Sequence, residues 1–219
     1  LNTYRELRTL NPFLLDFYTP QVSQHTEGYV GAVLNGYKNL SGFVHLGLAK
    51  WNQLPVFLND TIWNTRQFVT LYEPQAYTFL LDAGAEYALG SDMRAGLNYS
   101  WRPLMNETIR ERAWHYRPGI LKCYIMYSPA KRWQCRGEFI LFSGSHSLMV
   151  SDVPAYPVHL QSGVDLNLHA TYQYSSRWLF TADVLNAFNS GYQRWGNYPQ
   201  FGWMFRAGVR YAFHIPRML

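Results

Sequence analysis

The stretch YTFLLDAGAEYAL, residues Tyr77–Leu89, indicates the fold. Every second residue in it is apolar, and the positions between them include Asp82, Gly84 and Glu86. A repeat of two residues is typical of a β-strand with one apolar and one polar face. The stretch is longer than the roughly 9–11 residues that a tilted strand needs to cross a bilayer, whereas strands of globular proteins usually run about five or six residues. It therefore predicts a membrane-spanning strand.

The same alternation recurs along most of the chain. Together with some less regular segments, it predicts about nine strands. They cover residues 29–38, 42–52, 77–89, 93–101, 120–127, 133–142, 164–174, 178–188 and 201–213. Their apolar faces end in Tyr or Trp, as at a membrane interface, and the opposite faces carry charges or glycine. A soluble β-sandwich also alternates, but its inner face packs aliphatic side chains, so the pattern favours a membrane barrel.

The composition agrees with a barrel. Aromatic residues make up 17% of the 219 residues and charged residues only 15%, against roughly 25% charged residues in ordinary soluble domains. Mean hydropathy is −0.23, and no stretch approaches the roughly 18 apolar residues of a spanning helix. The net charge of +5 is spread along the chain, without the clustered basic stripe that nucleic-acid binding requires. We therefore expect no nucleic-acid partner.

The lengths of the connections predict an orientation, because short connections alternate with long ones. The short ones cover 39–41, 90–91, 128–132 and 175–177. The long ones cover 53–75, 103–117, 143–158 and 189–200. Outer-membrane barrels have short periplasmic turns and long extracellular loops. The sequence thus predicts a bacterial outer-membrane protein whose C-terminus lies in the periplasm.

Single-chain barrels have an even number of strands, so an odd count predicts at least one strand upstream, unless 4–15 supplies it. The expected fold class is all-β: an antiparallel transmembrane β-barrel, with about nine or ten strands here as the C-terminal portion of a larger barrel. Residues 1–27 are expected to form an extracellular loop or partial strand, 28–213 the barrel strands and loops, and 214–219 a periplasmic tail.

Charged residues on the polar face predict three cross-strand pairs that face the barrel lumen, since directly opposite residues share a face. The predicted pairs are Glu86–Arg94, Lys122–Glu138 and His169–Asp183. Such pairs contribute roughly 0.2–1 kcal/mol each, and the first interpretation is that they hold the register; a transport or catalytic role is the alternative. Further basic residues are expected on the same face: Arg102, Arg136, Arg206 and Arg210.

The same register concerns the two cysteines of the chain. It places Cys123 opposite Gly137, with Cys135 one diagonal step away. Diagonal neighbours lie about 7–8 Å apart, beyond comfortable disulfide reach. We expect two free, lipid-facing thiols, although a slip of register would allow a bond.

Catalytic and metal-binding constellations receive little support. Ser145, His146 and Asp152 share one long connection but lack the Gly-x-Ser-x-Gly elbow of a hydrolase. The seven His residues are scattered, and no pair has metal-ligand spacing on a predictable element. We therefore expect neither an enzyme nor a metal site or cofactor.

Aromatic residues crowd the long connections. They could contact a ligand, or they could pack the loops onto one another or belong to the outer aromatic girdle. The candidate ligand contacts are Trp63, Tyr72, Trp114, Tyr116, Tyr192, Trp195 and Tyr198.

The C-terminal third resembles the closing strands of TonB-dependent receptors. The resemblance rests on the run VLNAFN at 184–189, the Tyr- and Trp-bearing loop at 192–202, and the strand ending at Phe213. The segments LNPFL at 10–14 and AWHYRP at 113–118 are similar to parts of short TonB-receptor-like barrels. The resemblance is strongest over 165–213.

The resemblance implies a barrel of about 22 strands, an upstream plug domain, and TonB-powered uptake of siderophores, haem, vitamins or glycans. Neither a plug nor a TonB box is recognised within these residues, and no ligand-binding residue is carried over. The expected function is a receptor or transporter for a nutrient or iron complex. A structural barrel subunit of a secretion or surface assembly, or a passive porin, is the alternative. Outer-membrane lipid and lipopolysaccharide are expected partners, with a plug domain, TonB or other outer-membrane subunits as candidates.

Overall fold

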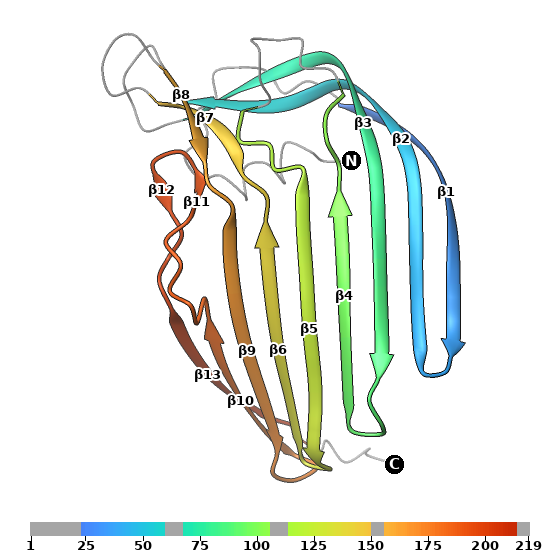
Figure 1. Ribbon diagram of the computed structural model, residues 1–219. Coiled ribbons are helices and arrows are strands. Elements are labelled where there is room, and N and C mark those ends of the chain that lie inside the picture. The colour runs from blue at the N-terminus through green and yellow to red at the C-terminus, as the bar shows by residue number, and fades with distance from the viewer. Residues whose placement is uncertain (1–22, 60–67, 106–113, 150–155, 214–219) are drawn as a thin grey trace, which may run out of the picture.

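The computed structural model describes residues 23–59, 68–105, 114–149 and 156–213. Within these ranges the chain forms thirteen strands. Nine of them build one antiparallel sheet in the order β1-β2-β3-β4-β5-β6-β9-β10-β13 (Figure 1). Among the residues described, no helix has the length and apolar composition needed to cross a bilayer.

The strands of the sheet follow one another in chain order, apart from two small inserted hairpins. The sheet strands are β1 (Gln24–Tyr37), β2 (Leu40–Asn59), β3 (Phe68–Ala88), β4 (Met93–Trp101), β5 (Gly119–Ala130), β6 (Trp133–Phe142), β9 (Gly163–Gln173), β10 (Trp178–Leu185) and β13 (Met204–Tyr211). The inserted hairpins are β7 (Ser145–Met149) with β8 (Tyr156–Leu160), and β11 (Gln193–Trp195) with β12 (Tyr198–Pro199). The nine predicted strands are thus confirmed, although the first begins at Gln24, before the expected start of the barrel region.

The predicted loop at 53–75 is wrong, because β2 and β3 continue through most of it. Their pairing runs on to Asn59 opposite Phe68, and the resulting arm bends over the ends of the neighbouring strands (Figure 1). Gln53 adopts a left-handed conformation with φ of 61°, and Pro55 pairs with Tyr72. Proline and irregular alternation usually mark a turn, but here they accompany a long paired arm.

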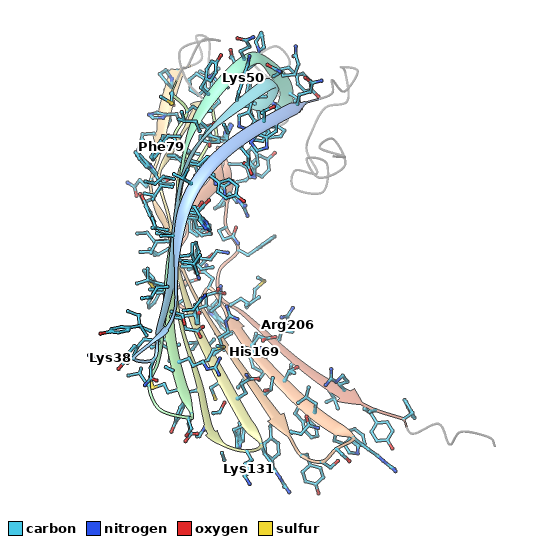
Figure 2. The ribbon with its side chains drawn as sticks, turned by 90° about the vertical axis from the view of Figure 1, so that its right-hand side faces the viewer. Lys38, Lys50, Phe79, Lys131, His169 and Arg206 are labelled. Carbon is cyan, nitrogen blue, oxygen red and sulfur yellow. The ribbon has the colours of Figure 1, made fainter. Side chains whose placement is uncertain are left out.

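The sheet is curved, so it has a concave and a convex face. Figure 2 shows His169 and Arg206 inside the curve. Because directly opposite residues share a face, the ladder pairs place Arg94, Arg136 and Glu138 on the concave face as well. Lys50 is an exception, because it lies opposite Tyr77 on the other face. Large apolar side chains stand exposed on the convex face, among them Tyr87, Tyr127 and Trp133. The sheet therefore separates polar from apolar residues as the alternation predicted.

The register of the β9–β10 hairpin is as predicted. His169 lies directly opposite Asp183, and the backbone N–H of Tyr174 donates to the carbonyl of Trp178 across the turn at 3.1 Å. The connection therefore has the three expected residues, 175–177, and the predicted His169–Asp183 pair is confirmed.

The predicted register of the β3–β4 hairpin is wrong by two residues. The N–H of Leu89 donates to the carbonyl of Met93 at 2.8 Å, so the turn covers residues 90–92, one position later in the chain than the turn over 89–91 that the predicted pair requires. Glu86 consequently lies opposite Gly96. It still forms a diagonal ion pair with Arg94, whose Nη1 lies 3.9 Å from Oε1.

The β5–β6 hairpin is also shifted by two residues. Its strands pair almost to the tip, and a β-bulge follows Tyr127, which adds an unpaired residue on one side. Glu138 therefore lies opposite Tyr124, and Lys122 lies opposite Ile140. An even shift keeps every side chain on its predicted face, but the predicted Lys122–Glu138 pair is not made.

The same shift separates the two cysteines. Cys123 lies opposite Phe139, and Cys135 lies opposite Tyr127. Both thiols are free, as predicted, but they are farther apart than the single diagonal step expected.

The buried apolar residues gather toward the end of the sheet with the long connections. They are Ala49, Leu54, Leu58, Ala76, Leu80, Trp114 and Leu160. Four parts of the chain pack together here, and we call them the cap. They are the β2–β3 arm, the segment 114–117 and the two inserted hairpins.

Candidate functional site

Basic residues form a row across the concave face. The ladder pairs place Arg94 opposite Met126, Met126 opposite Arg136, and Arg136 opposite His169. Asp183 and Arg206 continue the line on β10 and β13. We call Arg94, Arg136, His169 and Arg206 the basic row. Sequence alternation placed each of them on this face, but only the ladder shows that they are aligned.

Asp183 holds two members of the basic row in place. Its Oδ1 accepts a hydrogen bond from Nδ1 of His169, and its Oδ2 accepts one from Nε of Arg206 at 2.7 Å. The carboxylate is 5% exposed, so its charge is compensated where water cannot reach it well. Both side chains are fixed by this acid while their outer atoms face the inside of the curve.

An acidic row lies two residues nearer the long connections. Glu86, Gly96, Tyr124 and Glu138 are successive ladder neighbours. The hydroxyl of Tyr124 donates to Oε2 of Glu86 at 2.6 Å, and the guanidinium of Arg136 lies over its ring at 5.4 Å from the centroid. Tyr124 thus joins the two rows.

In all four arginine–carboxylate ion pairs of this face, the arginine reaches farther into solvent than the acid. The pairs are Arg94–Glu86, Arg102–Asp82, Arg136–Glu138 and Arg206–Asp183. The arginine side chains are 45–71% exposed and the carboxylates 7–38%. The carboxylates therefore lie against the wall, and the guanidinium groups present hydrogen-bond donors to whatever occupies the concave side.

A polar pocket of about 650 Å³ opens between the basic row and the short turns. It is lined on the turn side by Lys131 and Arg132 and on the strands by Gln134, Gln173 and Arg210. Arg210 was predicted on this face, and the two turn residues were not. The pocket extends the basic row toward the short-turn end.

His115 connects three parts of the cap. Its Nδ1–H donates to the carbonyl of Phe57 on the β2–β3 arm at 3.1 Å, and its Nε2 accepts from the hydroxyl of Ser147 on β7 at 2.9 Å. The ring also packs against Trp195 at 5.2 Å between centroids, and Trp195 packs against Phe57. Burial lowers the pKa of His115 to about 4, so the neutral ring is the form that this site holds.

A hydroxyl beside an imidazole can be a nucleophile with its base. Ser147 is fully buried, however, and a substrate cannot reach its oxygen. The described residues hold no group of three His, Cys, Asp or Glu side chains suited to a metal ion. The His115–Ser147 pair is therefore an internal contact of the cap.

The aromatic residues predicted as ligand contacts are packed into the cap or close to it. Trp114 is 8% exposed, the hydroxyl of Tyr116 donates to the carbonyl of Arg102, and that of Tyr192 donates to Asp165 at 2.9 Å. Burial and this hydrogen bond raise the pKa of Tyr192 to about 12. Tyr72, Trp195 and Tyr198 are half-buried. Trp63 lies outside the described residues. The arrangement agrees with the alternative that these residues pack the loops together.

Asn186 organises the loop between β10 and β11. Its Nδ2 donates to the carbonyls of Ser190 and Phe201 at 3.1 and 2.8 Å, and its Oδ1 accepts from the N–H of Ser190 at 3.1 Å. It has a φ of 47°, a left-handed conformation that Asn tolerates better than most residues.

Sequence reasoning did not single out His115 or Asn186 as individual residues. Both lie in motifs that carried the family resemblance, AWHYRP and VLNAFN. In these motifs His115 and Asn186 hold loop segments together through their hydrogen bonds.

No protein-family model and no curated protein matches the chain in sequence. Solved structures do match its fold. The copper transporter OprC superposes with a TM-score of 0.66 at 14% identity, and the siderophore receptor PirA from Acinetobacter baumannii with 0.63 at 12%. A mutant of the ferric enterobactin receptor PfeA from Pseudomonas aeruginosa gives 0.64 at 10%. Each match covers 87% of this chain and 32% of the other.

The fold is that of part of a β-barrel wall. The matched structures are TonB-dependent receptors, and the nine-stranded antiparallel sheet corresponds to part of their barrel. The chain spans about a third of the length of each, as the 32% coverage shows. In such barrels the concave side of the wall encloses the lumen, so we call the concave face of this barrel wall the lumen face.

Proposed function

We propose that this chain is part of an outer-membrane receptor that imports a nutrient or metal complex. The observation that carries the proposal is the division of this barrel wall into a convex face of exposed apolar side chains and a lumen face of paired charges. Such a wall is stable only when lipid covers one face and a polar interior the other.

The substrate class of this proposal follows the structural matches. Their names concern copper, siderophores and ferric enterobactin, so a metal ion or metal complex is the first candidate. In the same proposal the cap faces the outside of the cell, and the short turns and the C-terminus lie in the periplasm. A plug domain and TonB are the proposed partners.

Cysteine labelling on cells tests the location and orientation. In a Cys123→Ser/Cys135→Ser background, Asn197→Cys on the β11–β12 turn should react with a membrane-impermeant maleimide on intact cells. Lys131→Cys on the β5–β6 turn should react only after the outer membrane is permeabilised. Both positions are exposed, so a reversed pattern would contradict the orientation, and absence from the outer-membrane fraction would contradict the proposal.

Uptake measurements test the receptor function. A strain lacking the gene should take up less radiolabelled ferric siderophore or copper under limitation, and this uptake should need TonB. Normal uptake in a strain whose outer membrane lacks the protein would instead favour a structural subunit. Uptake that rises linearly with solute concentration without TonB would favour a porin.

A further inference from the structure

The two ends of the lumen face differ in charge. Toward the cap, the carboxylates of Glu86, Glu138 and Asp165 line the wall. Toward the short turns, the basic row is followed by Lys131 and Arg132, which line the 650 Å³ pocket. The lumen face is therefore most positive in its short-turn half.

Two acids of the short-turn half offset this charge only in part. Asp92 lines the pocket, but it shares the pocket with three basic residues, Lys131, Arg132 and Arg210. Asp183 is buried behind Arg206 and His169. Nε of Arg206 contacts this acid, and within the described part of the chain its two terminal nitrogens have no hydrogen-bond partner. Arg136 likewise uses only Nη2, toward Glu138 at 3.1 Å. Several guanidinium donors thus remain available to a partner.

The length of the basic row indicates the size of that partner. Arg94 and Arg206 are separated by five strand-to-strand steps, which at about 4.8 Å each gives roughly 24 Å. A single small anion can touch only one or two of these residues. An extended polypeptide rises about 3.3 Å per residue, so about seven residues would follow the row.

We propose that the basic row and its pocket bind an acidic polypeptide segment that lies inside the barrel. The carboxylates of the segment would pair with the free guanidinium nitrogens of Arg94, Arg136 and Arg206, whose planar forks suit carboxylates. This inference rests on the proposed barrel but not on what the barrel transports.

Site-specific photo-cross-linking in the full-length protein tests the inference. Met126 lies between Arg94 and Arg136 in the ladder, so Met126→p-benzoylphenylalanine should cross-link to a peptide with several Asp or Glu residues within about seven positions. The matched control is Ile140→p-benzoylphenylalanine, on the same face but nearer the cap, which should give little of this product.

Charge variants then establish the cause. Arg136→Gln/Arg206→Gln should lower the cross-linking yield about fivefold or more, since each lost ion pair is worth about 0.5 kcal/mol. Raising the salt concentration should lower it as well. Arg102→Gln, at the cap end of the same face, should leave the yield within about twofold. Heat-modifiable migration in gel electrophoresis verifies that each variant is folded, and Arg94→Gln provides a second test if the double variant is not.

Three results would overturn the inference. The first is a cross-linked peptide that is neutral or basic. The second is an unchanged cross-linking yield in the folded charge variants. The third is loss of the cross-link in millimolar citrate at constant ionic strength, which would identify the basic row as a site for a small anion. Fractionation of the same cells distinguishes a failure of this inference from a failure of the proposed function. A protein found outside the outer membrane contradicts the barrel, whatever it cross-links.

Discussion

The hydroxyl of Ser147 lies 2.9 Å from Nε2 of His115, although 32 positions separate the two residues in the chain. The same ring donates from Nδ1 to the carbonyl of Phe57. One imidazole thereby fixes the β2–β3 arm against β7. Because the ring is buried and neutral, its contribution to cap stability must depend on pH.

Acidification should loosen the cap. The pKa of His115 falls from 6.5 to about 4 on folding, so between these values the unfolded segment binds the proton more readily than the folded one. Stability is then fully present above about pH 6.5 and lost as pH falls toward about 4, by roughly 3 kcal/mol in all. Hydrogen exchange of the β7 amides should report this loss, and His115→Gln should remove the pH dependence. An unchanged pH profile in that variant would contradict the assignment.

Gly196→Ala should displace the β11–β12 hairpin. A Cβ atom at this position would lie 2.9 Å from Cβ of Ser147 and even closer to its hydroxyl. Forcing this contact costs about 1–3 kcal/mol, measurable as faster proteolysis of the loop. Gly191→Ala is the matched control, since nothing lies within 4 Å of its added Cβ. Equal proteolysis of the two variants would show that the close packing is unimportant.

Asn186→Ala should destabilise the loop that leads to β13. The substitution leaves the carbonyls of Ser190 and Phe201 without their donor, in a site where Asn186 itself is 4% exposed. A loss of about 2–4 kcal/mol is expected from buried groups left unsatisfied, read from denaturant unfolding in detergent. Asn35→Ala, on exposed β1, should change stability by less than about 0.5 kcal/mol.

Engineered cysteines can distinguish the two registers of the β5–β6 hairpin. The ladder places Cys123 opposite Phe139, so Phe139→Cys should form a disulfide with Cys123 under mild oxidation. Gly137→Cys, which would be opposite under the register expected from the sequence, should not. Non-reducing electrophoresis after cleavage between the strands gives the answer, with Cys135→Ser included in both proteins. A disulfide in the Gly137→Cys protein alone would restore the sequence-based register.

The wild-type thiols provide an independent test of the same geometry. Cys135 and Phe139 are four residues apart on β6, which is about 13 Å along the strand. Since Cys123 lies opposite Phe139, a bond between the native cysteines is out of reach. The folded protein is exposed to mild oxidation, the oxidant is removed, and the thiols are then titrated in denaturant without reductant. Both thiols should be free, and a single intramolecular disulfide would contradict the ladder.

The sequence by itself determined the strands and their faces. Alternation as in Tyr77–Leu89 depends only on neighbouring residues and on the two-residue period of a strand, so it needs no knowledge of the partners. It placed Arg94, Arg136 and Arg206 on the polar face and Tyr127 on the apolar one. The His169–Asp183 pair was also predictable, because a short, regular turn fixes its register.

Only the tertiary structure decided the register of the other two hairpins, the β2–β3 arm and the cap. A turn displaced by one position, or a β-bulge, changes the pairing by two residues without changing the faces, so alternation cannot detect it. Glu138 therefore meets Tyr124 instead of Lys122. The contacts of His115 join segments far apart in the chain, and no local pattern encodes them. The alignment of the basic row is likewise decided by the tertiary structure, because it depends on the registers of five separate strand pairs.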